Sequence, residues 1–486
     1  MAGMYDVAIV GCGITGAALA YELSKYQVKT VVLERGNDVA YATTRANSAI
    51  VHAGYDPEPG TMMARLNVRG NALIEQLAQT LDVPYQKIGS FVLALQPEDQ
   101  ETLRALYNRG VQNGVPELRL LSREEALAME PALSPDVLGA LYAPSAGIVS
   151  PWELCLALME AAVQNGAELR LMHEVTGVEK TEEGYALQTP QGPVHSRFVV
   201  NAAGVDAAKV HAMAAPADFT IAPSRGEYYL LDKNQGQLVS RVIFQCPSKV
   251  GKGVLVAPTV HGNLIVGPNA EPVGQGHDTA TTGQGLDFVR QQALKSVPGV
   301  NFRESIRNFA GVRANSDCDD FIIREAPGAP GFIDLAGIKS PGLTSAPAIA
   351  EEAVALLQGC GLALLPNEEF RAYRRKIRFK ELPVEEKQAL IRRDPRFGRV
   401  ICRCETITEG EIVAALHSPI PPTTLDGVKR RCNAGMGRCQ GGFCSPRVQE
   451  IISRELGLPM EQVLLGDLGT VILTGRTKSD KQGGLA

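Results

Sequence analysis

A glycine-rich turn between two apolar segments constrains the fold of this chain more than any other feature. Residues 5–10 (YDVAIV) predict a buried parallel strand, and the pattern Gly-x-Gly-x-x-Gly follows directly at positions 11–16. A helix-like stretch comes next, and then a second apolar strand that ends near Glu34. This order, with an acidic residue about 20 positions beyond the glycines, is typical of a dinucleotide-binding unit.

Each residue of the turn has a physical role in that unit. Gly11 allows the tight turn, Gly13 lets backbone amides approach a pyrophosphate, and Gly16 permits close packing of the helix. The N-terminus of the helix then faces the phosphates. Glu34 can hydrogen-bond a ribose hydroxyl, which favours a nucleotide without a 2′-phosphate. Cys12 is interpreted as a small residue beside the strand. The pattern alone does not separate FAD from NAD.

Composition limits the classes of protein to be considered. With 486 residues, about two or three domains are expected, and 45% hydrophobic residues suffice for a core. A net charge of −5 and a single tryptophan, Trp152, argue against nucleic-acid binding. No apolar run reaches the roughly 18 residues of a membrane span. Ten cysteines, mostly scattered, favour a reducing compartment. We therefore expect a soluble cytoplasmic protein.

Four cysteines near the C-terminus predict a second cofactor. Cys402 and Cys404 form a Cys-x-Cys motif, and Cys439 and Cys444 form a Cys-x-x-x-x-Cys motif in a glycine-rich segment. Two close pairs of thiolates are what a [2Fe–2S] cluster needs, because each iron takes two cysteine sulfurs. Zinc is the alternative, although the spacing differs from the usual paired Cys-x-x-Cys; free thiols are another. Cys432 lies nearby and is expected not to be a ligand.

Three later segments identify the type of flavoprotein. Residues 42–56 are small and polar, without an early third strand; a strand ends in FVVNAAGVDA (198–207), and GIKSPGLTSAPAIAEEAVALL near residue 340 opens a helix at a glycine turn. Over about residues 4–360 the chain resembles the D-amino-acid-oxidase-like flavoproteins, which bind FAD. The resemblance implies an α/β fold with a Rossmann-like FAD-binding domain and an inserted antiparallel α+β substrate domain.

Carried onto this sequence, the resemblance implies a set of cofactor contacts spread over four segments. Asn201 to Gly204 would line the adenosine side, and Gly342, Leu343 and Thr344 would approach the isoalloxazine ring. The full set is Gly11, Gly13, Ile14, Thr15, Gly16, Glu34, Arg35, Thr43, Thr44, Asn47, Ser48, Asn201, Ala203, Gly204, Gly342, Leu343 and Thr344.

Further motifs narrow the resemblance within these flavoproteins. NSAIVHAGYD, RGEYYLL (225–231), GVLVAPTVHGNLIVGPNA (253–270), FAGVRA (309–314) and IKSPGLT (338–344) are similar to the glycerol-3-phosphate and L-2-hydroxyglutarate dehydrogenase group. Residues of about 399–455 are similar to the small bacterioferritin-associated-ferredoxin-like [2Fe–2S] domain that is appended to anaerobic glycerol-3-phosphate dehydrogenase subunits.

The expected domain organisation follows from these segments. Residues 1–365 form the oxidoreductase domain, with substrate-domain segments at about 85–150 and 215–305. Residues 366–398 are a charged linker or surface helix, 399–460 are the [2Fe–2S] domain, and 461–486 are a tail. Thr408 and Glu411 predict a capping box at a helix start.

Oxidation of a secondary alcohol needs a base and anchors for the substrate anion besides the flavin. His52 is the favoured base, since neutral imidazole accepts a proton near pH 7 and the resemblance places its motif near the flavin. Arg313 and Lys252 are the candidate anchors, and two cations mildly favour a phosphate. The alternatives are a structural histidine, a surface ion pair and a solvated lysine. Ser48 and Ser340 are candidate hydrogen-bond donors.

The leading hypothesis is an FAD- and [2Fe–2S]-dependent dehydrogenase that oxidises sn-glycerol 3-phosphate to dihydroxyacetone phosphate. Its electrons would pass through the cluster to a partner subunit or the quinone pool, and peripheral membrane association through a partner stays open. One alternative is an L-2-hydroxyglutarate or other 2-hydroxyacid dehydrogenase. Another is an electron-transfer flavoprotein subunit of a larger oxidoreductase, and a third is a cluster with a structural or sensing role.

Overall fold

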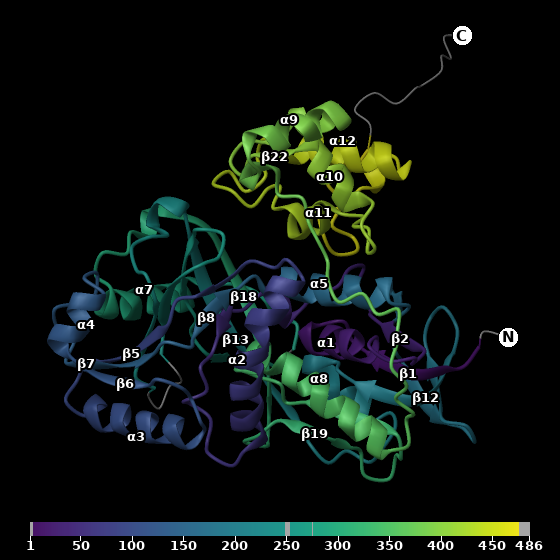
Figure 1. Cartoon of the computed structure of the whole chain (residues 1–486), viewed down its shortest axis with the longest axis horizontal. Helices are drawn as coiled ribbons and strands as arrows, with labels where there is room; N and C mark the ends of the chain where they lie inside the picture. Colours follow the sequence, from purple (N-terminus) through teal and green to yellow (C-terminus); the bar gives the residue numbers. More distant parts are fainter. Residues whose placement is uncertain (1–2, 248–252, 275, 476–486) are drawn as a thin grey trace, which may run out of the picture. The chain divides into compact units, whose positions relative to one another are not determined.

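Two units make up the chain, and they divide between Arg375 and Lys376. The computed structural model describes residues 3–247, 253–274 and 276–475. Unit 1 runs to Arg375 and unit 2 begins at Lys376 (Figure 1).

The first layer of unit 1 is a sheet built around β1 and β12. Its order is β10-β11-β12-β1-β2-β9, with β20 paired to β12 and β19 paired to β20. β1 is parallel to β2 and β12, and β20 is parallel to β12. The strands are β1 (Tyr5–Val10), β2 (Thr30–Leu33), β9 (Glu168–Arg170), β10 (Gly177–Lys180), β11 (Tyr185–Gln188), β12 (Val194–Asn201), β19 (Ile322–Glu325) and β20 (Phe332–Ala336). Nearly every residue of β1 and β2 is buried, as expected for parallel strands covered on both faces.

Helices from distant parts of the sequence cover this sheet. α1 (Ile14–Leu23) packs against α5 (Pro151–Gln164) and α8 (Gly342–Gly359), and α8 packs against α2 (Met62–Thr80) (Figure 1). The contact between α2 and α8 is close, because a Cβ on Gly70 would lie 2.1 Å from the carbonyl oxygen of Thr344. The beginning of α8 is therefore fixed by main-chain packing.

An antiparallel sheet forms the second layer of unit 1. Its order is β17-β13-β16-β15-β14-β5-β7-β6, and β18 pairs with β13 over the whole length of β13. The strands are β5 (Ser90–Ala94), β6 (Arg119–Ser122), β7 (Gly139–Ala143), β13 (Ile221–Leu231), β14 (Val242–Gln245), β15 (Leu255–Pro258), β16 (Leu264–Gly267), β17 (Glu271–Pro272) and β18 (Ser305–Ser316). The helices of this layer are α3 (Asp99–Gln112), α4 (Arg123–Met129) and α7 (Gly283–Ser296).

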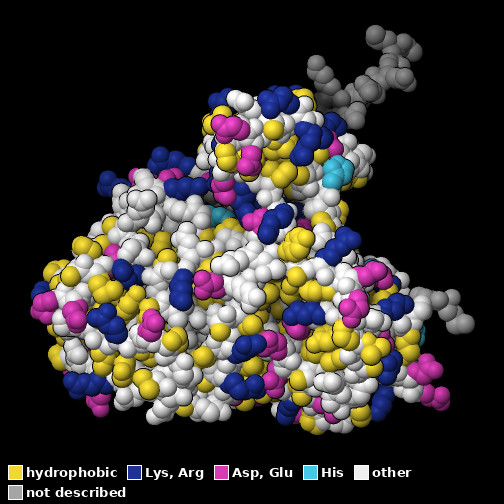
Figure 2. Space-filling model, viewed as in Figure 1, with side chains coloured by type: hydrophobic (Ala, Val, Ile, Leu, Met, Phe, Trp, Pro, Cys, Tyr) yellow, Lys and Arg dark blue, Asp and Glu magenta, His cyan; other side chains and the backbone are white. Residues whose placement is uncertain are grey.

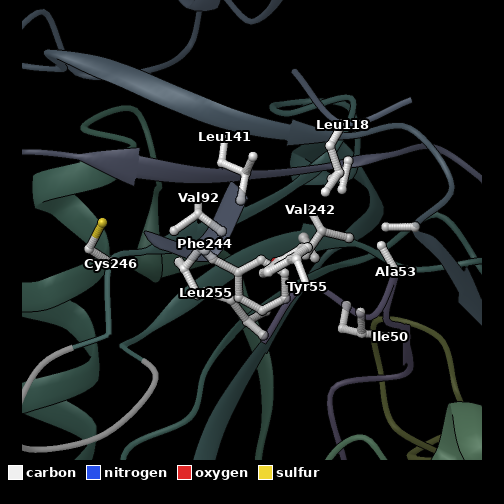
Figure 3. Close-up of a cluster of buried hydrophobic side chains, with 14 of the residues drawn as sticks. Ile50, Ala53, Tyr55, Val92, Leu118, Leu141, Val242, Phe244, Cys246 and Leu255 are labelled. Atoms are coloured by element: carbon white, nitrogen blue, oxygen red, sulfur yellow. The ribbon is translucent and has the colours of Figure 1, made fainter. Parts of the chain in front are cut away.

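Smaller elements complete unit 1. A three-stranded sheet joins β3 (Ile50–Val51), β8 (Gly147–Val149) and β4 (Tyr85–Lys87), and α6 (Ala207–His211) follows β12. One buried cluster lies between the antiparallel sheet and β3, and Figure 3 shows Val92, Val242 and Leu255 around the rings of Tyr55 and Phe244. This cluster supports the loop that carries His52.

Unit 2 is a small helical unit with its own apolar core. It contains α9 (Val384–Arg393), β21 (Val400–Cys402), β22 (Ile407–Thr408), α10 (Glu409–Leu416), α11 (Leu425–Cys432) and α12 (Ser445–Leu456). The predicted capping box is confirmed, since Thr408 and Glu411 satisfy each other's backbone amides at the start of α10. Ile412, Val428 and Ile452 from the three helices meet in the core.

The structure confirms the predicted α/β fold with a Rossmann-like layer and an antiparallel layer. The antiparallel sheet draws its strands from residues 90–143 and 221–316, close to the predicted substrate-domain segments. The other predicted domain boundaries stay predictions.

Candidate functional site

Main-chain contacts at the turn between β1 and α1 leave no room for side chains. Gly11 has a φ of +102°, and a Cβ there would lie 2.6 Å from the carbonyl oxygen of Ala202. A Cβ on Gly16 would lie 2.0 Å from the carbonyl oxygen of Gly11. Both positions therefore need glycine, and the first turn of α1 is held against the chain that follows β12.

Polar side chains face the amides of this turn. Thr44 Oγ1 accepts a hydrogen bond of 2.9 Å from the amide of Ile14, the first residue of α1. The carboxylate of Glu34 accepts hydrogen bonds from the amides of Cys12 and Gly36, each 2.8 Å long. Burial raises the pKa of Glu34, and these two amides oppose the rise. Glu34 thus lies just beyond β2, where this type of unit binds a ribose.

The loop of residues 43–47 is fixed against β18. Thr43 Oγ1 donates a 2.6 Å hydrogen bond to the carbonyl oxygen of Val312. Asn47 Nδ2 donates to the carbonyl oxygens of Thr43 and Thr44 at 3.1 and 2.9 Å. β18 passes so close that a Cβ on Gly311 would lie 1.8 Å from the carbonyl oxygen of Ala46. The loop is therefore ordered by the chain's own contacts.

A cavity of about 1630 Å³ connects the glycine turn with the start of α8. Ligand pockets usually measure about 300–1,000 Å³, so this cavity has room for a large cofactor together with a substrate. Fourteen of the predicted cofactor residues line it: Gly11, Gly13, Ile14, Thr15, Glu34, Arg35, Thr43, Thr44, Asn47, Ser48, Ala203, Gly204, Gly342 and Leu343. The glycine cradle, the buried carboxylate and the size of the cavity fit FAD.

Two predicted contact residues lie behind the cavity wall instead. Asn201 is fully buried, and its Nδ2 donates to Asp334 Oδ1 at 2.8 Å and to the carbonyl oxygen of Ala207 at 2.9 Å. Thr344 is also fully buried, and its Oγ1 accepts the amide of His52 at 2.9 Å. Neither residue lines the cavity, and their contact with the cofactor stays a prediction. Gly16, also absent from the wall, has the helix-packing role predicted for it.

His52 is held from several sides at the cavity. Its Nε2 lies 3.2 Å from Ser340 Oγ, and its ring stacks on Phe244 with 5.8 Å between the ring centroids. Its carbonyl oxygen accepts hydrogen bonds from Asn67 and Asn71 of α2 at 2.9 and 3.1 Å. Both His52 and Ser340 line the cavity. The structure thus brings together a candidate base and the hydroxyl that orients it.

Tyr228 was not among the predicted site residues, but it lies beside two that were, Arg313 and Ser48. Tyr228 is 4% exposed and lines the cavity together with Arg313 and Ser48. Burial raises the pKa of Tyr228, and Arg313 and Ser48 oppose the rise. A Cβ on Gly226 would lie 2.6 Å from Arg313 Nη2. The guanidinium therefore lies across the glycine of the neighbouring strand.

The alternation of side chains along a strand predicts that at most one of Tyr228 and Tyr229 faces the pocket, without showing which one. Tyr229 points to the other face, where it packs edge-on against Phe302 at 4.9 Å, so only one of the two neighbours reaches the cavity. Lys252, the second predicted cation, lies outside the described residues. Lys339, directly before Ser340, lines the cavity and was also missed.

In unit 2, the four predicted cysteines lie together in two pairs. Cys404 Sγ and Cys439 Sγ are 3.7 Å apart. The thiol of Cys444 donates to Cys402 Sγ, and this hydrogen bond lowers the pKa of Cys402 to about 6. Over the described ranges, no three His, Cys, Asp or Glu side chains are gathered around one possible metal position. Two pairs of sulfurs fit a two-iron cluster better than a single tetrahedral ion.

Cys432 behaves differently from these four. Its Sγ donates to the carbonyl oxygen of Val428 at 3.3 Å inside α11, and burial raises its pKa to about 12. A thiol that stays protonated is a poor ligand. The geometry agrees with the prediction that Cys432 is not a ligand.

A glycine cradle and a large cavity beside it are typical of a flavin-dependent oxidoreductase. Residues 6–356 match the family described as FAD dependent oxidoreductase, and the chain belongs to that family. Residues 400–454 match the BFD-like [2Fe-2S] binding domain. The predictions of FAD and a [2Fe–2S] cluster as cofactors are thereby confirmed.

The most informative relatives are similar over much or all of the chain. A glycerol 3-phosphate dehydrogenase of Caloramator mitchellensis is 50% identical, over 99% of this chain and 100% of that protein. A glycerol 3-phosphate oxidase of Mycoplasma genitalium is 35% identical over 72% of this chain and 94% of that protein. The FAD-bound structure of the L-alpha-glycerophosphate oxidase of Mycoplasma pneumoniae has a TM-score of 0.73 and 33% identity, covering 77% of this chain and all of that one.

The surface charges and the helices relate to the predictions about nucleic-acid binding and membrane spans. On the face of unit 1 that Figure 2 shows, basic and acidic side chains are interspersed, without a large basic area. Of the helices in the described ranges, none combines the length and the apolar character needed to cross a bilayer.

Proposed function

We propose that this chain oxidises sn-glycerol 3-phosphate at carbon 2 to dihydroxyacetone phosphate. The observation that carries the proposal is the placement of His52, Ser340, Tyr228 and Arg313 around one cavity in a chain 50% identical to a glycerol 3-phosphate dehydrogenase. Bound FAD supplies the two-electron acceptor for this oxidation, and the [2Fe–2S] cluster supplies a one-electron carrier.

Residues of the chain provide the base and bind the substrate. His52 Nε2 accepts the proton of the substrate hydroxyl, and Ser340 Oγ keeps the imidazole oriented. Arg313 binds the phosphate through its planar guanidinium, and Tyr228 lies beside that guanidinium. Lys339 adds a second positive charge at the cavity, which favours a phosphate over a single carboxylate. Lys252 is proposed to contribute in the same way.

In this proposal the ligands of the cluster are Cys402, Cys404, Cys439 and Cys444. Electrons leave the cluster for an acceptor protein or for the quinone pool, with any membrane association arising through that partner. We place the reaction in the cytoplasm, since the six cysteines outside the proposed cluster form no disulfides and a reducing compartment keeps thiols in that state.

Anaerobic titration of the holoprotein tests the substrate. Glycerol 3-phosphate should bleach the flavin absorbance, whereas L-2-hydroxyglutarate and glycerol should not. Bleaching by the 2-hydroxyacid alone would show that the Arg313 side of the cavity binds a carboxylate, and would replace this proposal with a 2-hydroxyacid dehydrogenase.

A variant of the base tests the mechanism. His52→Gln should lower the rate of flavin reduction by about 10²- to 10⁴-fold, the usual contribution of a general base, with little change in substrate affinity. His195→Gln, an exposed histidine on β12, is the matched control and should reduce at the wild-type rate. An unchanged rate in His52→Gln would mean that the flavin is reduced elsewhere, as in an electron-transfer subunit.

A further inference from the structure

The main chain at His52 is held by side chains of two helices. His52 lies directly after β3, a strand of only two residues. Its amide donates a 2.9 Å hydrogen bond to Thr344 Oγ1 of α8. Its carbonyl oxygen accepts hydrogen bonds from Asn67 and Asn71 of α2 at 2.9 and 3.1 Å. The position of this part of the chain thus depends on side chains of α2 and α8 as well as on sheet pairing.

Thr344 connects this main-chain contact with the hydroxyl that orients the imidazole. It lies four positions after Ser340, whose Oγ is 3.2 Å from His52 Nε2. The ring and the amide of one histidine therefore contact two hydroxyls of the same short segment, residues 340–344. A displacement of His52 relative to the start of α8 would change both contacts together.

The surroundings of Thr344 fix its own position. Its side chain is fully buried, and Oγ1 also donates a 3.3 Å hydrogen bond to the carbonyl oxygen of Ile50. Its carbonyl oxygen faces α2, where a Cβ on Gly70 would lie 2.1 Å away. Gly70 stands in the sequence between the two asparagines that bind the carbonyl oxygen of His52. Thr344 thus packs against the segment of α2 that holds the other side of the His52 main chain.

We propose that Thr344 is a positioning residue for the oxidation: its hydroxyl holds the main chain of His52, so that Nε2 stays within reach of Ser340 and of the substrate hydroxyl. The proposal rests on the proposed role of His52 as the base. Proton transfer needs its two heavy atoms within about 2.6–3.2 Å, and a misplacement of about 1 Å can cost about 100-fold in rate. Thr344 does not line the cavity, so its effect on the substrate passes through His52.

The rate of flavin reduction in the full-length holoprotein tests this role. Thr344→Val keeps the shape of the side chain and removes the hydroxyl; it should lower the rate with glycerol 3-phosphate about 10- to 100-fold, with flavin content and substrate affinity unchanged. Thr344→Ser keeps the hydroxyl and should restore most of the rate. Thr30→Val is the matched control, since Thr30 is buried outside the cavity wall and its hydroxyl donates to the carbonyl oxygen of Val28. It should reduce at the wild-type rate.

A double-mutant cycle with His52→Gln separates positioning from a general loss of stability. In the His52→Gln background, Thr344→Val should change the residual rate by less than about 2-fold, because the imidazole that Thr344 positions is already gone. An equal loss in both backgrounds, or a wild-type rate in Thr344→Val, would overturn the proposal. A wild-type rate in His52→Gln is a different result, and it would remove the base itself.

The ring signals of the histidines give a readout that needs no turnover. With ¹⁵N-labelled histidine, the signals of His52 can be assigned by their absence in His52→Gln. Thr344→Val should shift them, since the ring moves relative to Ser340, and Thr344→Ser should return them, while the other six histidines stay unchanged. Unchanged His52 signals, or shifts of all seven histidines, would overturn the proposal. If glycerol 3-phosphate fails to reduce the wild-type flavin, the proposed function fails, and these signals still decide the role of Thr344.

Discussion

The two ends of the cavity in unit 1 are built in different ways. At the cofactor end, main-chain atoms of residues 11–16 make the site, and Gly11 and Gly16 are needed because a Cβ at either position would collide with a carbonyl oxygen. At the substrate end, side chains of four separate segments meet, among them Tyr228 of β13 and Arg313 of β18. The cofactor end should therefore be sensitive to bulk and the substrate end to the loss of single functional groups.

The largest effect is expected from bulk at the cofactor end. Gly11→Ala should weaken FAD binding by about 100-fold, because alanine is strained at a φ of +102° and its Cβ would lie 2.6 Å from the carbonyl oxygen of Ala202. The flavin-to-protein ratio after dialysis measures this loss. Gly283→Ala, at an exposed position with open space around it, is the control and should keep its flavin. A full flavin content in Gly11→Ala would show that the turn can move.

A smaller effect is expected when charge is removed from the substrate end. Arg313→Gln should raise the KM for glycerol 3-phosphate by about 10- to 100-fold, since a hydrogen bond to a charged group contributes about 1.5–3 kcal/mol. Flavin content should stay normal. Arg307→Gln, an exposed arginine on the same strand, is the matched control. Equal KM values for the two variants would remove Arg313 from the site.

The smallest effect is expected when one hydroxyl is removed. Tyr228→Phe should raise KM by about 5- to 10-fold with little change in kcat, because the guanidinium of Arg313 loses one of its lateral partners. Tyr229→Phe removes the same group on the other face of β13 and should leave KM unchanged. A fall in kcat with an unchanged KM would instead place the Tyr228 hydroxyl at the reacting carbon.

The contrast between the two ends also explains what the sequence could predict. The glycine turn and Glu34 were predictable because each is recognised by its position relative to a strand or helix nearby in sequence. The loop of residues 43–47 was implied only by the resemblance. Resemblance to known motifs then identified His52, Ser340 and Arg313 without showing that they meet.

The parts of the site that the sequence did not predict depend on contacts between distant segments. Asn201 and Thr344 stand in motifs of the site, but both are fully buried and neither lines the cavity. A motif does not show which of its side chains are buried. The proximity of Tyr228 to Ser48 and Arg313 depends on which residues of β13 and β18 are paired. The sequence alone does not show this register.

In unit 2, the spacing of the cysteines predicted the cluster but not the pairing of its ligands. Each pair combines one cysteine from each motif, and the distance from Cys404 to Cys439 is set by how α10, α11 and α12 pack around their core. Spacing along the chain carries no information on such a pairing.

The hydrogen bond between Asn201 and Asp334 has a consequence for the alignment of the whole cavity. The two residues are direct partners in the parallel pair of β12, where Asn201 is the last residue, and β20, where Asp334 is the middle residue; they are 133 positions apart in sequence. A slip by one residue would shift one strand by about 3.3 Å and turn the Asp334 carboxylate to the opposite face of the sheet, away from the Asn201 amide. The same slip would displace Ser340 relative to Ala203. This buried pair thus fixes the register of β12 and β20, and with it the distance between Ala203 and Ser340 in the cavity wall.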